Sequence, residues 1–151
     1  MDLIREFFAV IYENLIYDPI HQIIFQHLFQ GWGYIYFGLI FIFLPMLFSA
    51  AFYFLYLWNP YAKWWHWAFW LTICLAFVFG ATYGTANLEI FASNNTALNQ
   101  ALASPQLPHY DYAVTLPYIY GAINVVLAFF VYMLFSLIFK QFSKLHSHLP
   151  I

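Results

Sequence analysis

Residues 34–58 read YIYFGLIFIFLPMLFSAAFYFLYLW and contain no charged side chain. A helix needs about 20 predominantly apolar residues to cross the hydrocarbon core of a bilayer, so this stretch is long enough to do so. The hydrocarbon core offers no water to backbone N–H and C=O groups, and a spanning stretch must therefore form a helix. The sequence predicts a transmembrane helix here, with a bend at Pro45.

Two later stretches have the same character, at about residues 64–88 and about residues 116–139. The first two stretches are joined only by residues 59–63, which begin with the turn-forming pair Asn-Pro. Because so short a connection reverses the chain, these two helices should run antiparallel. We predict an all-α membrane protein with a three-helix transmembrane domain at residues 34–139.

The overall composition supports this fold class. Of the 151 residues, 65% are hydrophobic and 7% are charged, whereas about 25% of the residues in soluble domains are charged. So few charges exclude a soluble globular enzyme and a disordered chain. They also exclude a nucleic-acid binder, which would need a basic surface. The lipid bilayer is therefore the first predicted partner.

The N-terminal segment, residues 1–33, has a different pattern. Residues 2–17 gather apolar side chains on one helical face, and Asp18-Pro19 should end that helix. A second short helix follows, and residues 31–33 (Gly-Trp-Gly) should form the corner into the first span. The pattern predicts two short amphipathic helices that lie in the membrane interface. The alternative is that they pack on neighbouring protein.

The charged residues predict the orientation in the membrane. Bases concentrate on the cytoplasmic side of membrane proteins, and three spans place Lys63, Lys140 and Lys144 on one side. Only Arg5 lies on the other side, where the outer loop at residues 89–115 has no base. We expect the N-terminus outside and the short basic tail, residues 140–151, on the cytoplasmic or matrix side of a bacterial or organelle inner membrane. The six acids then lie outside: Asp2, Glu6, Glu13, Asp18, Glu89 and Asp111.

Two details of the outer loop are also predicted. Residues 95–103 could form a short helix with Leu98 and Leu102 one turn apart, and Pro117 should stand where the third span begins. Tryptophan rings favour the membrane–water boundary because one edge is apolar and the other can hydrogen-bond to water. The predicted interfacial anchors are Trp32 at the outer boundary and Trp58, Trp64, Trp65 and Trp67 at the inner one.

A stripe of small residues follows the second span. Ala76, Gly80 and Gly84 are spaced four apart and share one helical face. Small residues let another helix backbone approach closely, which is how helices gain packing energy in lipid. One interpretation is a helix-packing seam between chains. The other is that the stripe packs on the first or third span of the same chain.

Asn124 is a strongly polar residue inside the third span. Thr82 and Tyr83 lie at a comparable depth on the second span, so either could be its partner. A polar side chain within a span suggests a functional site. An interhelical hydrogen bond is the commoner explanation.

The sequence offers no catalytic, cofactor or metal constellation. No acid or base lies within a predicted span, and His66 is the one histidine close to a span. Haem would need two facing histidines inside the membrane, and the single Cys74 cannot form an internal disulfide.

These observations favour a non-catalytic multi-pass membrane subunit or anchor of a larger complex. Its expected partners are other membrane protein subunits or copies of itself. The alternative is a homo-oligomeric channel or pore whose outer vestibule would carry Glu89 and Asp111. An accessory protein that handles lipid or quinone is a weaker third hypothesis.

Overall fold

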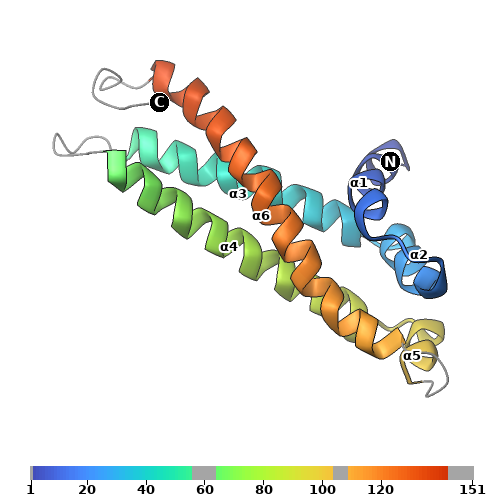
Figure 1. The fold of residues 1–151 in the computed structure, drawn as a ribbon. Coiled ribbons are helices and arrows are strands. Elements are labelled where there is room, and N and C mark those ends of the chain that lie inside the picture. The colour runs from blue at the N-terminus through green and yellow to red at the C-terminus, as the bar shows by residue number, and fades with distance from the viewer. Residues whose placement is uncertain (1, 56–63, 104–108, 143–151) are drawn as a thin grey trace.

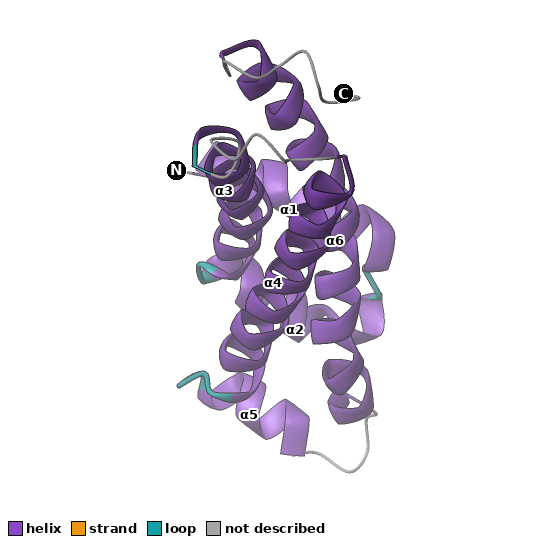
Figure 2. Ribbon diagram, turned by 90° about the vertical axis from the view of Figure 1, so that its left-hand side faces the viewer, coloured by secondary structure: helices purple, strands orange, loops and turns teal. Residues whose placement is uncertain are grey.

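The computed structural model describes residues 2–55, 64–103 and 109–142. All regular structure in these ranges is helical, as Figure 2 shows. The elements are α1 (Asp2–Ile16), the short 3-10 helix η1 (Pro19–His21), α2 (Gln22–Gln30), α3 (Gly33–Phe54), α4 (Trp64–Phe91), α5 (Thr96–Ala103) and α6 (His109–Phe142).

The three long helices α3, α4 and α6 form the body of the molecule (Figure 1). Each of them packs against the other two. By length and composition each is able to cross a membrane, which confirms the three predicted candidate spans. Pro45 lies inside α3 and is buried.

The helix that contains the third candidate span begins before the predicted span. α6 starts at His109 rather than near residue 116, and Pro117 lies within it instead of where it begins. A proline removes one backbone hydrogen bond from a helix. The turns before Pro117 are nevertheless held in place, because the side chains of Ala113 and Leu116 are fully buried.

The predicted outer loop at residues 89–115 is largely helical as well. α4 continues past Leu88 to Phe91, and the expected short helix is present as α5. The Asn95 side chain caps α5, because its Oδ1 accepts hydrogen bonds from the backbone N–H groups of Ala97 and Leu98 at 3.1 and 3.2 Å.

α1, η1, α2 and α5 lie at one end of the long helices and are called the cap here (Figure 1). As predicted, the chain breaks between α1 and η1, where Asp18 Oδ1 accepts a hydrogen bond from the Ile20 N–H at 2.9 Å. The predicted corner into the first span also holds, because α3 begins at Gly33.

One face of α1 packs on the chain's own bundle. Phe8, Ala9 and Tyr12 are buried, and the Phe8 ring lies so close to Gly38 of α3 that a side chain there would collide with it. The opposite side of α1 exposes apolar residues, among them Leu3 and Phe7, at 80% and 62% of their surface. One face of α1 is therefore covered by the bundle of the same chain.

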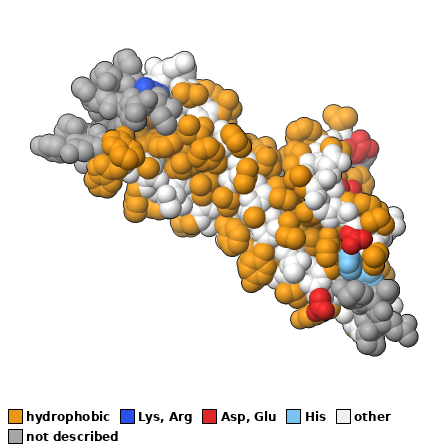
Figure 3. Space-filling view, in the orientation of Figure 1, with side chains coloured by type: hydrophobic (Ala, Val, Ile, Leu, Met, Phe, Trp, Pro, Cys, Tyr) orange, Lys and Arg blue, Asp and Glu red, His pale blue; other side chains and the backbone are white. Residues whose placement is uncertain are grey.

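Charges separate along the length of the molecule. Figure 3 shows carboxylates on the half that carries the cap, and basic side-chain atoms at the opposite end. Lys140 lies in the last turn of α6, whereas Asp111 lies in its first turn, 29 positions earlier in the numbering. The two ends of the bundle therefore differ in charge.

Candidate functional site

A polar cluster around Asn124 joins four helices inside the bundle. Asn124 Nδ2 donates hydrogen bonds to Thr82 Oγ1 of α4 at 2.8 Å and to the Phe37 carbonyl oxygen of α3 at 3.0 Å. Its Oδ1 accepts a hydrogen bond from the Tyr12 hydroxyl of α1 at 2.5 Å. Asn124 is fully buried, so this hydrogen-bonded contact is shielded from solvent and lipid.

Of the two partners considered for Asn124, the structure brings Thr82 to it. Tyr83 points elsewhere, and its hydroxyl donates to the Tyr118 hydroxyl at 3.4 Å. Tyr12 was not anticipated as a partner, because it lies 112 positions away and before the first span. Both the donor and the acceptor atoms of the Asn124 amide are used, which is the arrangement of a structural contact.

Aromatic rings surround this cluster. The Tyr12 ring stacks on Tyr34 with a centroid distance of 5.7 Å and meets Phe37 and Tyr120 edge-on at 5.8 and 5.5 Å. Such offset and edge-to-face contacts are favourable beyond the area that they bury. Through these ring contacts α1 packs against both α3 and α6.

A second polar cluster lies in the cap and consists of two histidines. The Nδ1 atoms of His21 in η1 and His109 in α6 are 2.8 Å apart, and both side chains are buried. One ring must donate and the other accept, so at least one of them is neutral. The His21 ring also stacks on Tyr112 with a centroid distance of 4.0 Å. The contact between the two histidines joins residues 88 positions apart in the sequence.

The environment of His21 disfavours its charged form. Burial lowers the pKa of His21 below its ordinary value, and the neighbouring His109 acts in the same direction. Asp18 opposes this effect; its carboxylate lies 4.0 Å from His21 Nε2. His21 therefore favours the neutral imidazole.

A third histidine joins α2 to α4 and to the start of α5. His27 Nε2 lies 3.0 Å from the Glu89 carbonyl oxygen, and His27 Nδ1 lies 3.1 Å from Asn95 Nδ2. Because Asn95 Oδ1 already caps α5, its Nδ2 must face the histidine. His27 Nδ1 then accepts and Nε2–H donates, so the contacts select the neutral Nε2–H tautomer.

The predicted seam on α4 faces away from the bundle. Ala76 and Gly80 are exposed and Gly84 is partly exposed. A Cβ added at Gly80 or Gly84 would meet no atom within 4 Å. The interpretation that the stripe packs on the first or third span of its own chain is therefore wrong. α4 instead uses other residues for that packing: Leu71, Cys74, Val78, Thr82, Ala86 and Ile90.

Several polar side chains of α4 bond back to their own helix. Thr72 and Thr85 donate to the carbonyl oxygens of Ala68 and Ala81, and Asn87 Nδ2 donates to the Tyr83 carbonyl oxygen at 2.9 Å. A polar side chain whose donor bonds to a carbonyl oxygen of its own helix does not require a hydrogen bond to water at that donor.

The tryptophan predictions have different outcomes. Trp64 and Trp65 are exposed at the start of α4, and Trp32 is 43% exposed, with the Arg5 guanidinium 5.3 Å from its ring centroid. Trp67 instead turns inward, where its Nε1–H donates to Ser136 Oγ at 3.2 Å, so it joins α4 to α6. Trp58 lies outside the described residues.

The two vestibule candidates both lie at the cap end of the bundle. Asp111 is exposed in the first turn of α6. Glu89, near the end of α4, is partly buried, and its Oε2 would lie 3.8 Å from a Cβ added at Gly31. Within the described ranges, no group of three or more His, Cys, Asp or Glu side chains is arranged to hold a metal ion.

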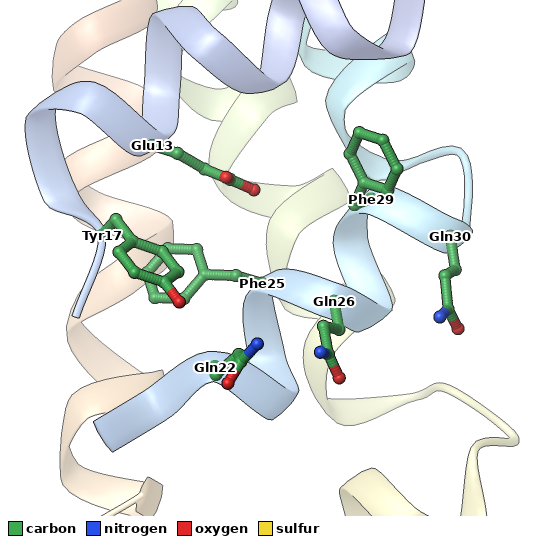
Figure 4. A pocket seen from close by; sticks show the side chains of 7 residues that line it. All are labelled: Glu13, Tyr17, Gln22, Phe25, Gln26, Phe29 and Gln30. Carbon is green, nitrogen blue, oxygen red and sulfur yellow. The ribbon is translucent and has the colours of Figure 1, made fainter. Parts of the chain in front are cut away.

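A groove of about 300 Å³ opens between α1 and α2. Figure 4 shows Glu13 projecting from α1 toward the space beside α2, with Phe25 and Phe29 on the α2 side. Its full lining is Glu13, Tyr17, Gln22, Phe25, Gln26, Phe29 and Gln30.

No protein-family model, curated protein or solved structure matches this chain. Its function is therefore inferred from the residues described above.

Proposed function

We propose that this chain is a non-catalytic, multi-pass subunit or anchor of a larger membrane protein complex. Its contact with another transmembrane helix is formed by Ala76, Gly80 and Gly84 of α4. The observation that carries the proposal is the direction of this seam, which faces away from the chain's own bundle. In lipid, where apolar helices gain little from leaving the solvent, close backbone approach along small residues drives association.

The position of the ionisable side chains supports a non-catalytic role. In the described parts of α3, α4 and α6, charged residues and histidines lie near helix ends, as with Glu89, Asp111 and Lys140. A proton relay or an intramembrane hydrolase would need such groups at the depth of the bilayer centre. Asn124, a fully buried polar residue of α6, is occupied by its hydrogen bonds to Tyr12, Thr82 and Phe37.

Gly80→Leu tests the seam. No atom of the chain lies within 4 Å of a Cβ at this position, so the variant should fold while its side chain keeps a partner helix away. We expect the complex extracted from native membranes in mild detergent to become smaller on size-exclusion chromatography. Val126→Leu is the matched control, because Val126 is exposed on α6 and outside the seam.

The same experiment separates the possible partners. If the chain expressed alone forms the full-sized assembly, the partner is a second copy; if unrelated subunits co-purify in fixed ratio, it is another protein. A Gly80→Leu variant that is helical by circular dichroism and keeps the wild-type assembly size would refute the seam.

A pore is the second candidate, favoured by the carboxylates that gather at the cap end (Figure 3). Glu89 and Asp111 would then attract cations to a vestibule. The lining of a water-filled pore would need a hydrophilic stripe along a helix. α4 does not present one at Thr72, because the Thr72 hydroxyl donates its hydrogen bond to the Ala68 carbonyl oxygen of the same helix. In planar bilayers a pore would conduct, and neutralising both acids (Glu89→Gln with Asp111→Asn) would lower its cation selectivity. Purified protein without conductance excludes this candidate.

A further inference from the structure

The groove between α1 and α2 contains a carboxylate, that of Glu13, which forms no ion pair with the basic side chains that the structure describes. Glu13 is partly buried and is the one charged residue in the lining. None of the described basic side chains forms an ion pair with it: Arg5 lies over the Trp32 ring, and Lys140 is at the far end of α6. A carboxylate in the wall of a groove favours a cationic partner there.

Glu13 also acts on the interior of the bundle. Its carboxylate is close enough to the Tyr34 hydroxyl to interact with it electrostatically. That hydroxyl is buried, and no hydrogen bond of good geometry reaches it from the residues that the structure describes. Glu13 thus lies between the open groove on one side and a buried polar atom on the other.

The α2 side of the groove carries neutral amides beside Phe25 and Phe29. Gln22, Gln26 and Gln30 follow one another at intervals of four along α2 and are exposed. An amide both donates and accepts hydrogen bonds. A carboxylate beside a row of amides complements a zwitterion, since the carboxylate and the amide oxygens accept from an ammonium group while the amide N–H groups donate to a phosphodiester.

The aromatic side chains distinguish between two kinds of ammonium group. A quaternary ammonium is recognised by the open faces of several rings. Here Phe25 is only 1% exposed, so of the three rings in the lining only those of Tyr17, 44% exposed, and Phe29, partly exposed, present an open face. The hydrogen-bond acceptors around Glu13 favour a primary ammonium, which can donate three hydrogen bonds.

The groove lies at the level expected for lipid headgroups. α1 exposes apolar side chains such as Leu3 and Phe7, whereas the neighbouring α2 exposes its glutamines. The boundary between acyl chains and water should therefore pass between these two helices. α3, a candidate span, begins directly after α2.

We propose that the groove between α1 and α2 binds the ethanolamine headgroup of a phospholipid. Glu13 holds the ammonium group, and Gln22 and Gln26 contact the phosphodiester. This site rests on the placement of the chain in a membrane but not on the seam of α4. Its failure and that of the seam are therefore distinguishable.

The test is native mass spectrometry of the full chain released from nanodiscs that contain equal amounts of phosphatidylethanolamine, phosphatidylcholine and phosphatidylglycerol. The wild-type chain should retain phosphatidylethanolamine at about tenfold excess, and Glu13→Gln should abolish this preference. Glu6→Gln is the matched control, because Glu6 is an exposed acid on the same helix and lies outside the groove. Gln26→Leu, at an exposed position, should also weaken retention.

Three outcomes would overturn the proposal. Equal retention of the three lipids means that the groove has no headgroup preference. Loss of the preference in Glu6→Gln as well as Glu13→Gln would assign it to overall charge. Soluble phosphoethanolamine that competes as tightly as the lipid would identify a small-molecule site instead.

Discussion

Asn124 shows how a single polar residue connects the helices of the bundle. Its amide contacts Tyr12, Thr82 and the Phe37 carbonyl oxygen, so one side chain joins α6 to α1, α4 and α3. In a membrane an interhelical hydrogen bond contributes about 0.6 kcal/mol on average. The larger effect comes from leaving buried partners without a hydrogen bond.

Asn124→Leu should lower the stability of the bundle by about 1–3 kcal/mol, because the Tyr12 hydroxyl and Thr82 would lose their buried partner. Thermal unfolding in detergent, followed by circular dichroism, measures this change. Asn87→Leu is the control, since the Asn87 amide bonds only to the Tyr83 carbonyl oxygen of its own helix. Equal melting temperatures for the two variants would contradict this account of Asn124.

An added side chain would have opposite effects at two glycines of the bundle. At Gly38 of α3 an added Cβ would collide with the Phe8 ring of α1, whereas at Gly80 of α4 it would meet nothing within 4 Å. Close packing tolerates extra volume poorly, at a typical cost of about 1–3 kcal/mol.

Gly38→Ala should therefore loosen α1 from α3, and Gly80→Ala should leave it in place. Hydrogen exchange of the α1 backbone in detergent is the measurement, and we expect faster exchange in Gly38→Ala only. Unchanged exchange in that variant would mean that Phe8 moves aside at little cost.

At the scale of helices, three histidines connect the cap to the long helices. His21 joins η1 to His109 of α6, and His27 joins α2 to the Glu89 carbonyl oxygen of α4. The contact between His27 and Asn95 requires an unprotonated Nδ1. Because burial disfavours the charged form of His21, the attachment of the cap should depend on pH.

The sign of that dependence follows from His21, whose pKa is lowered by burial and by His109. Between the folded pKa and the ordinary value of about 6.5, the unfolded chain binds more protons than the folded one. The contribution of His21 to stability is thus fully present above about pH 6.5 and is lost as the pH falls through the folded pKa. We expect the melting temperature to fall between pH 7.5 and pH 5, and to fall less in His21→Gln. The same pH slope in both proteins would exclude His21 as the cause.

At the scale of the whole molecule, the two ends of the bundle differ in charge and in architecture. The cap end carries carboxylates such as Asp111, and the other end carries Lys140 (Figure 3). If bases mark the cytoplasmic side, the cap faces outward.

A protease added to intact cells should therefore remove a tag fused to the N-terminus and leave a C-terminal tag untouched. Lysed cells, in which both tags are accessible, provide the control. Cleavage of the C-terminal tag alone would reverse the proposed orientation, and equal behaviour of the two tags would contradict an odd number of spans.

The positions of the helices could be predicted from the sequence because span length and hydropathy are properties of contiguous residues. The break at Asp18, the corner before Gly33 and the short helix α5 followed from local turn and capping chemistry. The start of α6 at His109 could not be predicted in this way. Its first turns are polar, and burial of Ala113 against distant parts of the chain supports them.

A helical chain with three stretches able to cross a membrane follows from the order of the residues alone, because an uncharged apolar stretch in lipid must form its backbone hydrogen bonds internally. The packing of the helices was needed to establish that Gly80 faces outward, that Thr82 rather than Tyr83 contacts Asn124, and that His21 contacts His109. The physical reason is that these outcomes depend on how each helix is rotated about its own axis. That rotation is set by contacts between residues as far apart as the 112 positions that separate Tyr12 from Asn124.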